Sequence, residues 1–533
     1  MINRNYGLSR KLGSALTLAS AALLFDGCTT GDDYVPDEID IPLSEKLPNI
    51  VFILSDDLGY GDISMTNGFN PGNSVVDTPN IDSIAARGFN FSNAYVAAPV
   101  CAPSRGGFFT SLYPASMGFE SNGTSRDNFD RMGKNNMGNL LKEAGYSTAL
   151  IGKWDLSGGG ITGNGIISQL SNQNILPHAR GFDYFYGIPG GTNSFYPINA
   201  PADAVHIVGS AIQIGGTLDP STTGRNIREY GLSGSGYGPT DRYTQVSPQE
   251  HLTDAFTDKA LHFIDAHANQ ENPFFLFLSH HAPHSPFQAT KHYYDMYDSI
   301  SDPTERIYAA MVHHMDVRIG DILEKLDDLG ITDNTLIIFA SDNGGVSTRA
   351  NGTPGPASNG GLRDGKWTVF EGGIRIPFAL SWPAVYQQEN QIFDHPITLL
   401  DLLPTMLRAA GYSSASIRAM NFNGVDIHPW LSGTRNGPIH EILFWRYIAD
   451  SLHEGTFMCA VRMGNMKYIF RRESSHVPGR EYLFDLMSNR AEDDNFNLID
   501  ERIYLAQRMA IVSVLGTWEA AMLPLPAGTP RRK

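Results

Sequence analysis

The sequence predicts an α/β fold with a large, mostly parallel mixed sheet flanked by helices and a smaller C-terminal antiparallel α+β subdomain. Short, uninterrupted apolar runs alternate with amphipathic helical patterns from residue 48 onward, as in sheets that are covered on both faces. From about residue 421 this alternation gives way to short strand-like runs separated by turns. Hydrophobic residues make up 41% and charged residues 18% of the 533-residue chain, a balance that excludes wholesale disorder.

Four apolar runs are predicted to be parallel strands of the large sheet, at residues 50–54, 148–151, 274–278 and 336–340. Helices are expected between them because apolar residues recur there at three- and four-residue spacing. The expected helices cover residues 79–87, 137–144, 252–266 and 305–329. Three of them are followed by a glycine, the residue at which helices commonly stop: Gly88, Gly145 and Gly330.

Two further regions depart from this alternation. Residues 156–250 are rich in Gly, Ser and Asn, and long irregular insertions in compact domains commonly serve as functional loops. Residues 421–533 contain strand candidates at 442–446, 457–463, 467–470 and 482–486, with a closing helix at 505–518. We therefore expect a large α/β domain at residues 47–420, followed by a smaller antiparallel subdomain at residues 421–533.

The first segment is predicted to be a targeting signal rather than part of the fold. Three basic residues precede an apolar stretch at residues 13–25, which is too short to span a bilayer and ends close to Cys28. Residues 1–27 are interpreted as a signal peptide of the lipoprotein type, and residues 28–46 as a polar tether. Cys28 follows a small residue, as in bacterial lipoproteins, but Phe25 and Asp26 fit that pattern poorly, so simple cleavage near this point stays open. The expectation is an exported protein, either periplasmic or held at the outer membrane or cell surface by a lipid on Cys28.

Charge and cysteine content exclude several classes of protein. The 39 Lys and Arg residues against 56 Asp and Glu residues give a formal net charge of −17. No nucleic-acid partner is expected, because sequence-independent nucleic-acid binding needs a basic surface. Three cysteines exclude a disulfide framework, and Cys459 is expected to be an inert buried thiol. No membrane span is predicted, since no later segment approaches the roughly 20 apolar residues of a membrane helix.

Polar clusters follow the predicted parallel strands, at the edge where open α/β sheets bind ligands. The first and fourth strands are followed by Asp56-Asp57 and Asp342-Asn343. Two such pairs at equivalent strand ends favour a metal site over solvated turns. Their oxygen ligands suit a hard cation rather than zinc, and no histidine lies within either pair. One Ca²⁺ ion is expected, with Mg²⁺ as the second choice, because Ca²⁺ tolerates crowded and irregular carboxylate geometry.

A cysteine motif supplies a candidate nucleophile. In Cys101-Ala102-Pro103-Ser104-Arg105, the proline fits the first turn of a helix and so places Cys101 at the helix N-terminus. That location favours negative charge on or near the cysteine side chain. Arg105 is a candidate cationic clamp, so the motif would complete a catalytic site that already contains a metal cluster.

The same pentapeptide resembles the Cys-x-Pro-x-Arg signature of type I, formylglycine-dependent sulfatases, which belong to the alkaline phosphatase superfamily. The resemblance extends over roughly residues 47–500, with further motifs at residues 48–62, 362–366, 371–377, 401–405 and 482–486. It implies hydrolysis of sulfate esters, with residues 47–420 as the catalytic domain. It also implies that a formylglycine-generating maturation enzyme oxidises Cys101 to formylglycine (3-oxoalanine). One hydroxyl of the aldehyde hydrate would attack sulfur, and the other would later expel sulfate as the aldehyde reforms.

The resemblance also implies roles for individual residues. Five side chains would hold the metal ion: Asp56, Asp57, Asp342, Asn343 and the modified Cys101. Arg105 would orient the formylglycine, while Lys153 and Lys366 would hold the sulfate oxygens. His284 would contact the substrate and protonate the leaving oxygen. Arg363 lies in the same motif as Lys366 and is expected to be a further substrate contact.

One position departs from the sulfatase pattern. The family usually has Gly-Lys-Trp-His-Leu-Gly, whereas this chain reads Gly152-Lys153-Trp154-Asp155-Leu156-Ser157. The missing histidine normally helps to remove the proton from the second hydroxyl during sulfate release. Asp155 is expected to act as that base, and His178 or His281 is the alternative if one of them reaches the site in space. The third alternative is a slow enzyme or a non-catalytic binder of sulfated glycans.

Export and the long loops after Lys153 favour a sulfated polysaccharide or oligosaccharide over a small aryl sulfate as the substrate. Four aromatic residues in this region would either stack on sugars or pack on the sheet: Tyr184, Tyr186, Phe195 and Tyr196. A phosphomonoesterase or phosphodiesterase of the same superfamily is the alternative function. Cys101 and the oxygen-only metal ligands count against it.

Overall fold

The computed structural model describes most of the chain after residue 45. The described residues are 46–69, 74–122, 133–156, 176–192, 194–196, 201–208, 211–215, 227–233, 236–237, 244–245, 250–348, 352–449, 456–474 and 477–524. All of them belong to one compact unit, Pro42–Lys533. The predicted signal peptide, Cys28 and most of the predicted tether lie outside the described residues. Among the described residues, no helix combines the length and apolarity needed to cross a bilayer.

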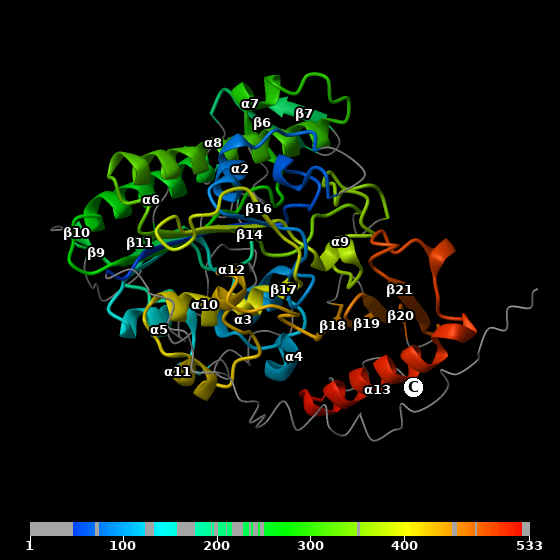
Figure 1. The fold of residues 1–533 in the computed structure, drawn as a ribbon. Helices are drawn as coiled ribbons and strands as arrows, with labels where there is room; N and C mark the ends of the chain where they lie inside the picture. Colours follow the sequence, from blue (N-terminus) through cyan, green and yellow to red (C-terminus); the bar gives the residue numbers. More distant parts are fainter. Residues whose placement is uncertain are drawn as a thin grey trace, which may run out of the picture. The chain divides into compact units, whose positions relative to one another are not determined.

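A ten-stranded mixed sheet forms the centre of the fold, with β1 (Asn49–Ser55) in its interior (Figure 1). Strand β1 pairs in parallel with β12 (Phe274–Ser279) and β14 (Thr335–Ser341), and β12 pairs in parallel with β4 (Ser147–Lys153). The full order is β11-β8-β5-β4-β12-β1-β14-β15-β2-β16. The four predicted parallel strands are therefore adjacent. Antiparallel pairing occurs where β15 joins β14 and β2, and where β8 joins β5 and β11, so the predicted mixed sheet is confirmed.

The outer strands of this sheet are shorter. Their bounds are β2 (Phe89–Phe91), β5 (Tyr184–Ile188), β8 (Arg228–Tyr230), β11 (Thr244–Gln245), β15 (Phe378–Ser381) and β16 (Gln391–Phe393). Small sheets and hairpins are formed by β3 (Ala94–Tyr95), β17 (Ile397–Thr398), β6 (Ala204–Val208), β7 (Ala211–Ile214), β13 (Gln288–Thr290), β9 (Leu232–Ser233) and β10 (Gly236–Tyr237).

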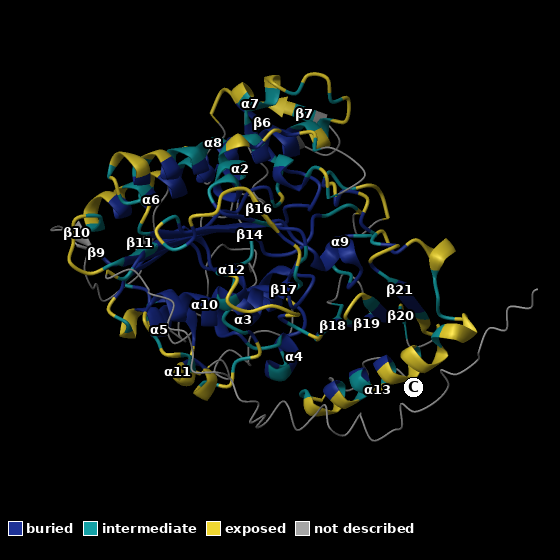
Figure 2. Cartoon of the chain, in the orientation of Figure 1, coloured by how far each residue is buried: buried dark blue, intermediate teal, exposed yellow. Residues whose placement is uncertain are grey.

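Helices cover both faces of the large sheet (Figure 1). Helices α2 (Pro79–Ala86), α6 (Leu252–His267) and α8 (Pro303–Asp328) pack on the face that receives Val51 and Ile53 of β1. Helices α3 (Cys101–Thr110), α5 (Met137–Glu143) and α10 (Leu402–Ala409) pack on the face that receives Ile50 and Phe52. Successive strand side chains point to opposite faces, so an uninterrupted apolar run supplies both cores. Figure 2 shows the strands of the sheet in dark blue, exposed residues in yellow on α6 and α8, and the wholly buried α10 in dark blue.

The shorter helices lie mainly in connections. They are α4 (Pro114–Met117), α7 (Lys291–Asp295), α9 (Glu371–Ile374), α11 (Ser414–Ala419) and α12 (His428–Leu431). The longest predicted helix begins earlier than expected, at Pro303, because proline suits a first helical position and the Asp302 side chain accepts hydrogen bonds from Thr304 N and Glu305 N.

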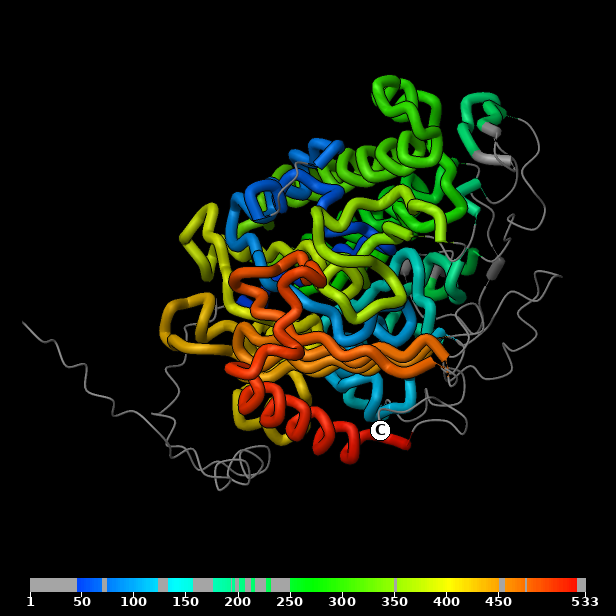
Figure 3. Tube along the Cα trace, turned by 90° about the vertical axis from the view of Figure 1, so that its right-hand side faces the viewer, coloured from blue at the N-terminus to red at the C-terminus, as the bar shows by residue number. Residues whose placement is uncertain are grey.

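The C-terminal part contains the predicted antiparallel sheet. Its strands are β18 (Ile442–Ile448), β19 (Phe457–Met463), β20 (Met466–Arg472) and β21 (Arg480–Asp485), in that order. Trp445 and Ile469 face the main core, whereas Val461 and Tyr468 face α13 (Leu505–Ala521), which lies along the sheet in Figure 3. The Cys459 side chain is buried on the α13 side, as expected.

A buried charge cluster joins this C-terminal sheet to α9. The Lys467 ammonium group lies 2.8 Å from Glu371 Oε1 and 2.8 Å from Glu492 Oε1, and all three side chains are inaccessible to solvent. The Glu371 backbone N–H donates to Glu492 Oε2 at 2.6 Å. Burial by itself would raise the pKa of Glu371, but Lys467 and Arg375 lower it below its ordinary value. The cluster therefore holds α9, which follows the loop carrying Lys366, against the C-terminal sheet.

Replacing Lys467 tests how much this cluster contributes. Lys467→Met would leave two buried carboxylates without their shared cation, so we expect the free energy of unfolding in urea to fall by about 3–5 kcal/mol. Lys291→Met is the matched control, because Lys291 pairs with Asp295 on the exposed helix α7 and its loss should cost less than about 1 kcal/mol. Equal losses in the two variants would contradict this account of the cluster.

Candidate active site

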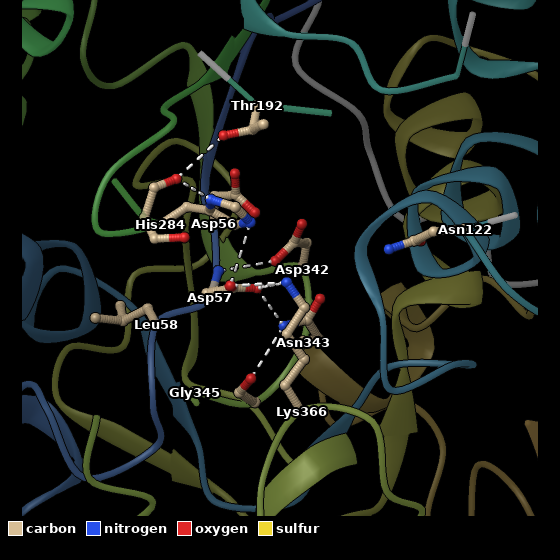
Figure 4. Close-up of polar contacts among 12 residues, drawn as sticks. Asp56, Asp57, Leu58, Asn122, Thr192, His284, Asp342, Asn343, Gly345 and Lys366 are labelled. Atoms are coloured by element: carbon tan, nitrogen blue, oxygen red, sulfur yellow. Dashed lines mark hydrogen bonds and ion pairs between the residues drawn. The ribbon is translucent and has the colours of Figure 1, made fainter. Parts of the chain in front are cut away.

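The carboxyl ends of four adjacent strands bring the predicted site residues together. Asp56 directly follows β1, and the backbone N–H of the next residue, Asp57, donates to Asp342 Oδ1 at 3.1 Å. Asn343 Nδ2 donates to Asp57 Oδ1 at 2.8 Å. Figure 4 shows these side chains converging between His284 and Lys366. Asp57 has a φ of 63°, a left-handed conformation that Asp tolerates better than most residues, and this sharp turn aims its carboxylate at the strand ends.

Cys101 is the first residue of α3, as the motif predicts, and its side chain is buried. Its Sγ, one carboxylate oxygen each of Asp56 and Asp57, and one ring nitrogen of His284 all lie within 4.8 Å of one another. The candidate nucleophile and the metal-ligand cluster therefore occupy one site. The Ala102 backbone N–H, in the first turn of α3, donates to Asn122 Oδ1 at 3.3 Å.

Arg105 ties α3 to three strand ends. Its Nε donates to Asp342 Oδ2 at 2.9 Å, and its Nη1 donates to the Lys153 carbonyl oxygen at 2.9 Å and to Ser279 Oγ at 2.7 Å. The guanidinium is buried among β4, β12 and β14, so it fixes the position of the helix that begins with Cys101. Sequence reasoning missed Ser279, because a serine at a strand end carries no signal of this contact.

The two lysines each pair with a different carboxylate of the Asp56-Asp57 pair. Lys153 Nζ lies 2.8 Å from Asp56 Oδ2, and Lys366 Nζ lies 2.6 Å from Asp57 Oδ1. Both ammonium groups are buried beside Cys101 and contribute to its electrostatic environment. They are thus placed to hold an anion in the same site.

Two histidines reach the cluster from the loop after β12. His281 Nδ1 lies 2.9 Å from Asp56 Oδ2, and His284 Nε2 lies 3.5 Å from Asp57 Oδ2. Their rings stack with centroids 5.0 Å apart. Neither the Asp-Asp pair nor the Asp-Asn pair contains a histidine in the sequence. The fold nevertheless places His281 and His284 next to the Asp-Asp pair. Burial lowers the pKa of His284 to about 3, so its ring is neutral in the free protein.

Burial is the largest influence on the pKa values of Cys101 and Asp56. It raises the pKa of the Cys101 thiol to about 12, although Lys153 and Lys366 act in the opposite direction. The nearby positive charge therefore does not suffice to ionise the unmodified side chain, because desolvation outweighs it. Burial also acts to raise the pKa of Asp56, but the positive charges of Lys153 and Arg105 hold it well below its ordinary value.

The oxygen atoms of the cluster fit a hard cation. Within the described part of the chain, Asp56 Oδ1 and Asn343 Oδ1 are buried oxygens that accept no hydrogen bond. Buried polar atoms without partners are uncommon and often mark the place of an ion. Asp57 and Asp342 border the same space, so the donor set is rich in carboxylate and amide oxygen, which divalent hard cations prefer.

Comparison with known proteins identifies the family to which this site belongs. A family model described as Sulfatase matches residues 48–412, more than half of the 533 residues. The chain belongs to the sulfatase family. The protein is therefore a sulfuric ester hydrolase, and the cysteine motif, both lysines and the candidate metal cluster lie within the matched span.

Individual sulfatases resemble this chain over most of its length. Steryl-sulfatase of Homo sapiens is 31% identical over 451 residues, which cover 74% of this chain and 72% of the relative. N-acetylgalactosamine-6-sulfatase of Homo sapiens is 30% identical over 419 residues, covering 77% and 70% of the two chains. The solved structure of Ps i-CgsB in complex with k-i-k-neocarrahexaose is 27% identical, with a TM-score of 0.70, and the match covers 91% of this chain and 95% of that chain.

Asp155, which departs from the usual sulfatase pattern, lies at the site. Its Oδ2 is 3.4 Å from Lys153 Nζ, and its side chain is 12% exposed. Of the two histidines considered as alternative bases, His281 contacts Asp56 directly, whereas the ring of His178 lies against Tyr230 of β8 with centroids 4.8 Å apart. Asp155 and His281 are thus the candidates that the fold brings to the cluster.

Arg363 faces away from the cluster, and the four aromatic side chains considered for sugar stacking are buried. The Arg363 guanidinium donates to the Glu492 carbonyl oxygen at 3.0 Å and lies 4.1 Å from the Phe370 ring centroid, so it faces the C-terminal part. Its role as a substrate contact stays a prediction. The four aromatic side chains considered for sugar stacking are all at most 4% exposed: Tyr184, Tyr186, Phe195 and Tyr196. These four side chains therefore pack in the interior rather than stack on sugars.

Asn359 is a positioning residue that the sequence did not reveal. Its buried side chain accepts from Gly345 N at 3.0 Å and donates to the carbonyl oxygens of Gly345 at 3.1 Å and Asp364 at 2.9 Å. Lys366 N also donates to the Gly345 carbonyl oxygen at 3.1 Å. Asn359 therefore joins the loop that follows Asn343 to the loop that carries Lys366.

Removing the Asn359 amide should affect both stability and catalysis. Asn359→Ala leaves buried backbone groups of Gly345 and Asp364 with fewer partners, so the free energy of unfolding should fall by about 1–3 kcal/mol. A small displacement of Lys366 should also lower kcat/KM for a sulfate ester, by up to about a hundredfold. The exposed residue Asn495 provides the control, since Asn495→Ala should change stability by no more than about 0.5 kcal/mol. Wild-type stability and kcat/KM in Asn359→Ala would refute the positioning role.

Proposed function

We propose that this sulfatase removes sulfate from a sulfated polysaccharide or oligosaccharide outside the cytoplasm, using a formylglycine at position 101 and one bound Ca²⁺ ion. The observation that carries the proposal is the placement of Cys101 Sγ within 4.8 Å of carboxylate oxygens of Asp56 and Asp57. Lys153 and Lys366 contact those same carboxylates. The proposed nucleophile, cation ligands and anion-binding groups thus belong to one cluster of side chains.

Formylglycine would arise before catalysis, through a separate formylglycine-generating enzyme that uses an oxidant to convert the Cys101 side chain to an aldehyde. The high pKa of the thiol supports this requirement, because the unmodified side chain is neutral near pH 7 and lacks thiolate reactivity. Water would add to the aldehyde to give a hydrate with two hydroxyl groups on one carbon. One hydroxyl oxygen would form a bond to sulfur while the bond from sulfur to the alcohol oxygen breaks. The second hydroxyl would then lose its proton, and the carbonyl would reform as sulfate leaves.

The surrounding residues would hold charge and protons in place. Arg105 would orient residue 101 through its anchors on the strand ends, and Lys153 and Lys366 would hold the sulfate oxygens. His284 would supply a proton to the leaving alcohol once the anionic substrate has raised the basicity of its ring. Calcium, when bound by Asp56, Asp57, Asp342 and Asn343, would add positive charge that favours ionisation of a hydroxyl group.

A sulfated carbohydrate is the substrate class that we favour. The similar structure of Ps i-CgsB was solved with k-i-k-neocarrahexaose, and its match extends over 91% of this chain. The predicted signal peptide would place the protein outside the cytoplasm, as a periplasmic protein or a lipoprotein anchored through Cys28. Polymers that cannot enter the cell are accessible in those locations.

Modification of Cys101 can be tested directly. After co-production with a formylglycine-generating enzyme, the peptide containing residue 101 should have lost H₂S and gained one oxygen atom by mass spectrometry. Desulfation of a panel of defined sulfated sugars should depend on that change, and Cys101→Ala should reduce kcat/KM at least about a thousandfold. An unmodified peptide from an enzyme with full activity would disprove the formylglycine mechanism.

The role of Asp155 in sulfate release has a separate test. Asp155→Asn removes the proton acceptor, so we expect one rapid turnover followed by accumulation of sulfated enzyme, visible in the intact-protein mass. The same experiment with His281→Gln examines the alternative base. If steady turnover is unchanged in Asp155→Asn, Asp155 is not the base.

A further inference from the structure

Lys153 has a more negative environment than Lys366. Its ammonium group lies between two carboxylates, 2.8 Å from Asp56 Oδ2 and 3.4 Å from Asp155 Oδ2. Lys366, in contrast, contacts the Asp57 carboxylate at 2.6 Å, and no second carboxylate is in ion-pair contact with it among the described residues. Asp155 thus adds a negative charge on one side of the anion site, and it is not part of the cluster that fits the cation.

The backbone holds Asp155 in this position. The chain leaves β4 at Lys153, and the Trp154 N–H donates to the Ile188 carbonyl oxygen at 2.9 Å. Asp155 then adopts a φ of 58°, in the left-handed region. Gly191 lies close against the carboxylate, since a Cβ atom at this glycine would be 2.9 Å from Asp155 Oδ1. The carboxylate has limited room to move away from Lys153.

The formal charges of the site can be compared with those of possible substrates. Four carboxylates surround it: Asp56, Asp57, Asp155 and Asp342. Three cations contact them: Arg105, Lys153 and Lys366. With a divalent metal ion bound, these groups carry one net positive charge, which matches a sulfate monoester. A phosphate monoester carries about two negative charges above its second pKa near 6. Without the Asp155 charge, the site would match that dianion instead.

We propose that Asp155 is a specificity-determining residue that disfavours dianionic phosphate monoesters relative to monoanionic sulfate monoesters. A like charge a few ångströms from the ligand acts strongly in a buried site, where water screens it poorly. Discrimination of this kind relies on repulsion of the wrong ligand rather than on extra contacts to the right one. The inference rests on the proposed function, in which Lys153 holds the sulfate group of the substrate.

Binding measurements can isolate this effect from turnover. Calorimetry would give the Kd of phenyl sulfate and of phenyl phosphate for the unmodified Cys101 protein with Ca²⁺ present, as wild type and as Asp155→Asn. Asparagine has the same size as aspartate and tolerates a left-handed φ, so this variant should fold normally. At pH 8, the preference for sulfate over phosphate should fall at least about tenfold in Asp155→Asn. At pH 5, where phenyl phosphate is mainly a monoanion, the change should be less than about threefold.

A surface variant controls for overall charge. Asp295→Asn removes one negative charge from the exposed helix α7, where Asp295 pairs with Lys291, and it should leave the preference unchanged at both pH values. An unchanged preference at pH 8 in Asp155→Asn, an equal change at pH 5, or no binding of phenyl sulfate by wild type would each overturn the inference. The proposed function is tested separately by desulfation with the mature enzyme, so the two can fail independently.

Discussion

The buried carboxylates at the ends of β1 and β14 are the constraint on which the rest of the site depends. Asp56, Asp57 and Asp342 are withdrawn from water, and charges in such positions are very costly unless cations and hydrogen-bond donors surround them. Lys153, Lys366 and Arg105 supply that compensation. Lys153 and Lys366 are also the groups proposed to hold the anionic substrate, while Arg105 anchors the helix that begins with residue 101. The lysines that stabilise the buried carboxylates would therefore also bind the sulfate ester.

Support for the site extends well beyond the residues that line it. Lys366 reaches Asp57 from a loop that Asn359 fastens to Gly345. The helix that follows this loop is in turn held by Lys467 and Glu492 of the C-terminal part. The antiparallel subdomain thus has a structural link to catalysis, although its sheet contributes none of the predicted catalytic residues. A defect in that link would displace Lys366, which we propose to hold sulfate, without altering any other group at the reaction centre.

The chemical state of residue 101 and the charge of residue 155 would set what the site can do. Burial keeps the Cys101 thiol neutral, so the unmodified chain has the complete arrangement of charges but lacks an ionised nucleophile. Conversion to formylglycine would supply the missing group without moving the helix, because Arg105 already anchors it to three strands. Asp155 leaves those contacts intact and changes the local charge beside Lys153. Asp155 would thus bear both on sulfate release, as the proposed base, and on the choice of substrate, through its charge beside Lys153.

The sequence by itself determined the four central parallel strands, the C-terminal antiparallel strands, the longest helices and the placement of Cys101 at the start of α3, because these follow from apolar periodicity and proline position. It also indicated that oxygen-rich pairs at two strand ends would meet, since parallel strands end at the same edge. Only the tertiary structure decided which distant groups join them. His281 reaches Asp56 across 225 positions, and Lys366 reaches Asp57 across 309. The thiol pKa and the burial of the loop aromatics were likewise decided by packing, because desolvation depends on all the surrounding chain and no local pattern records it.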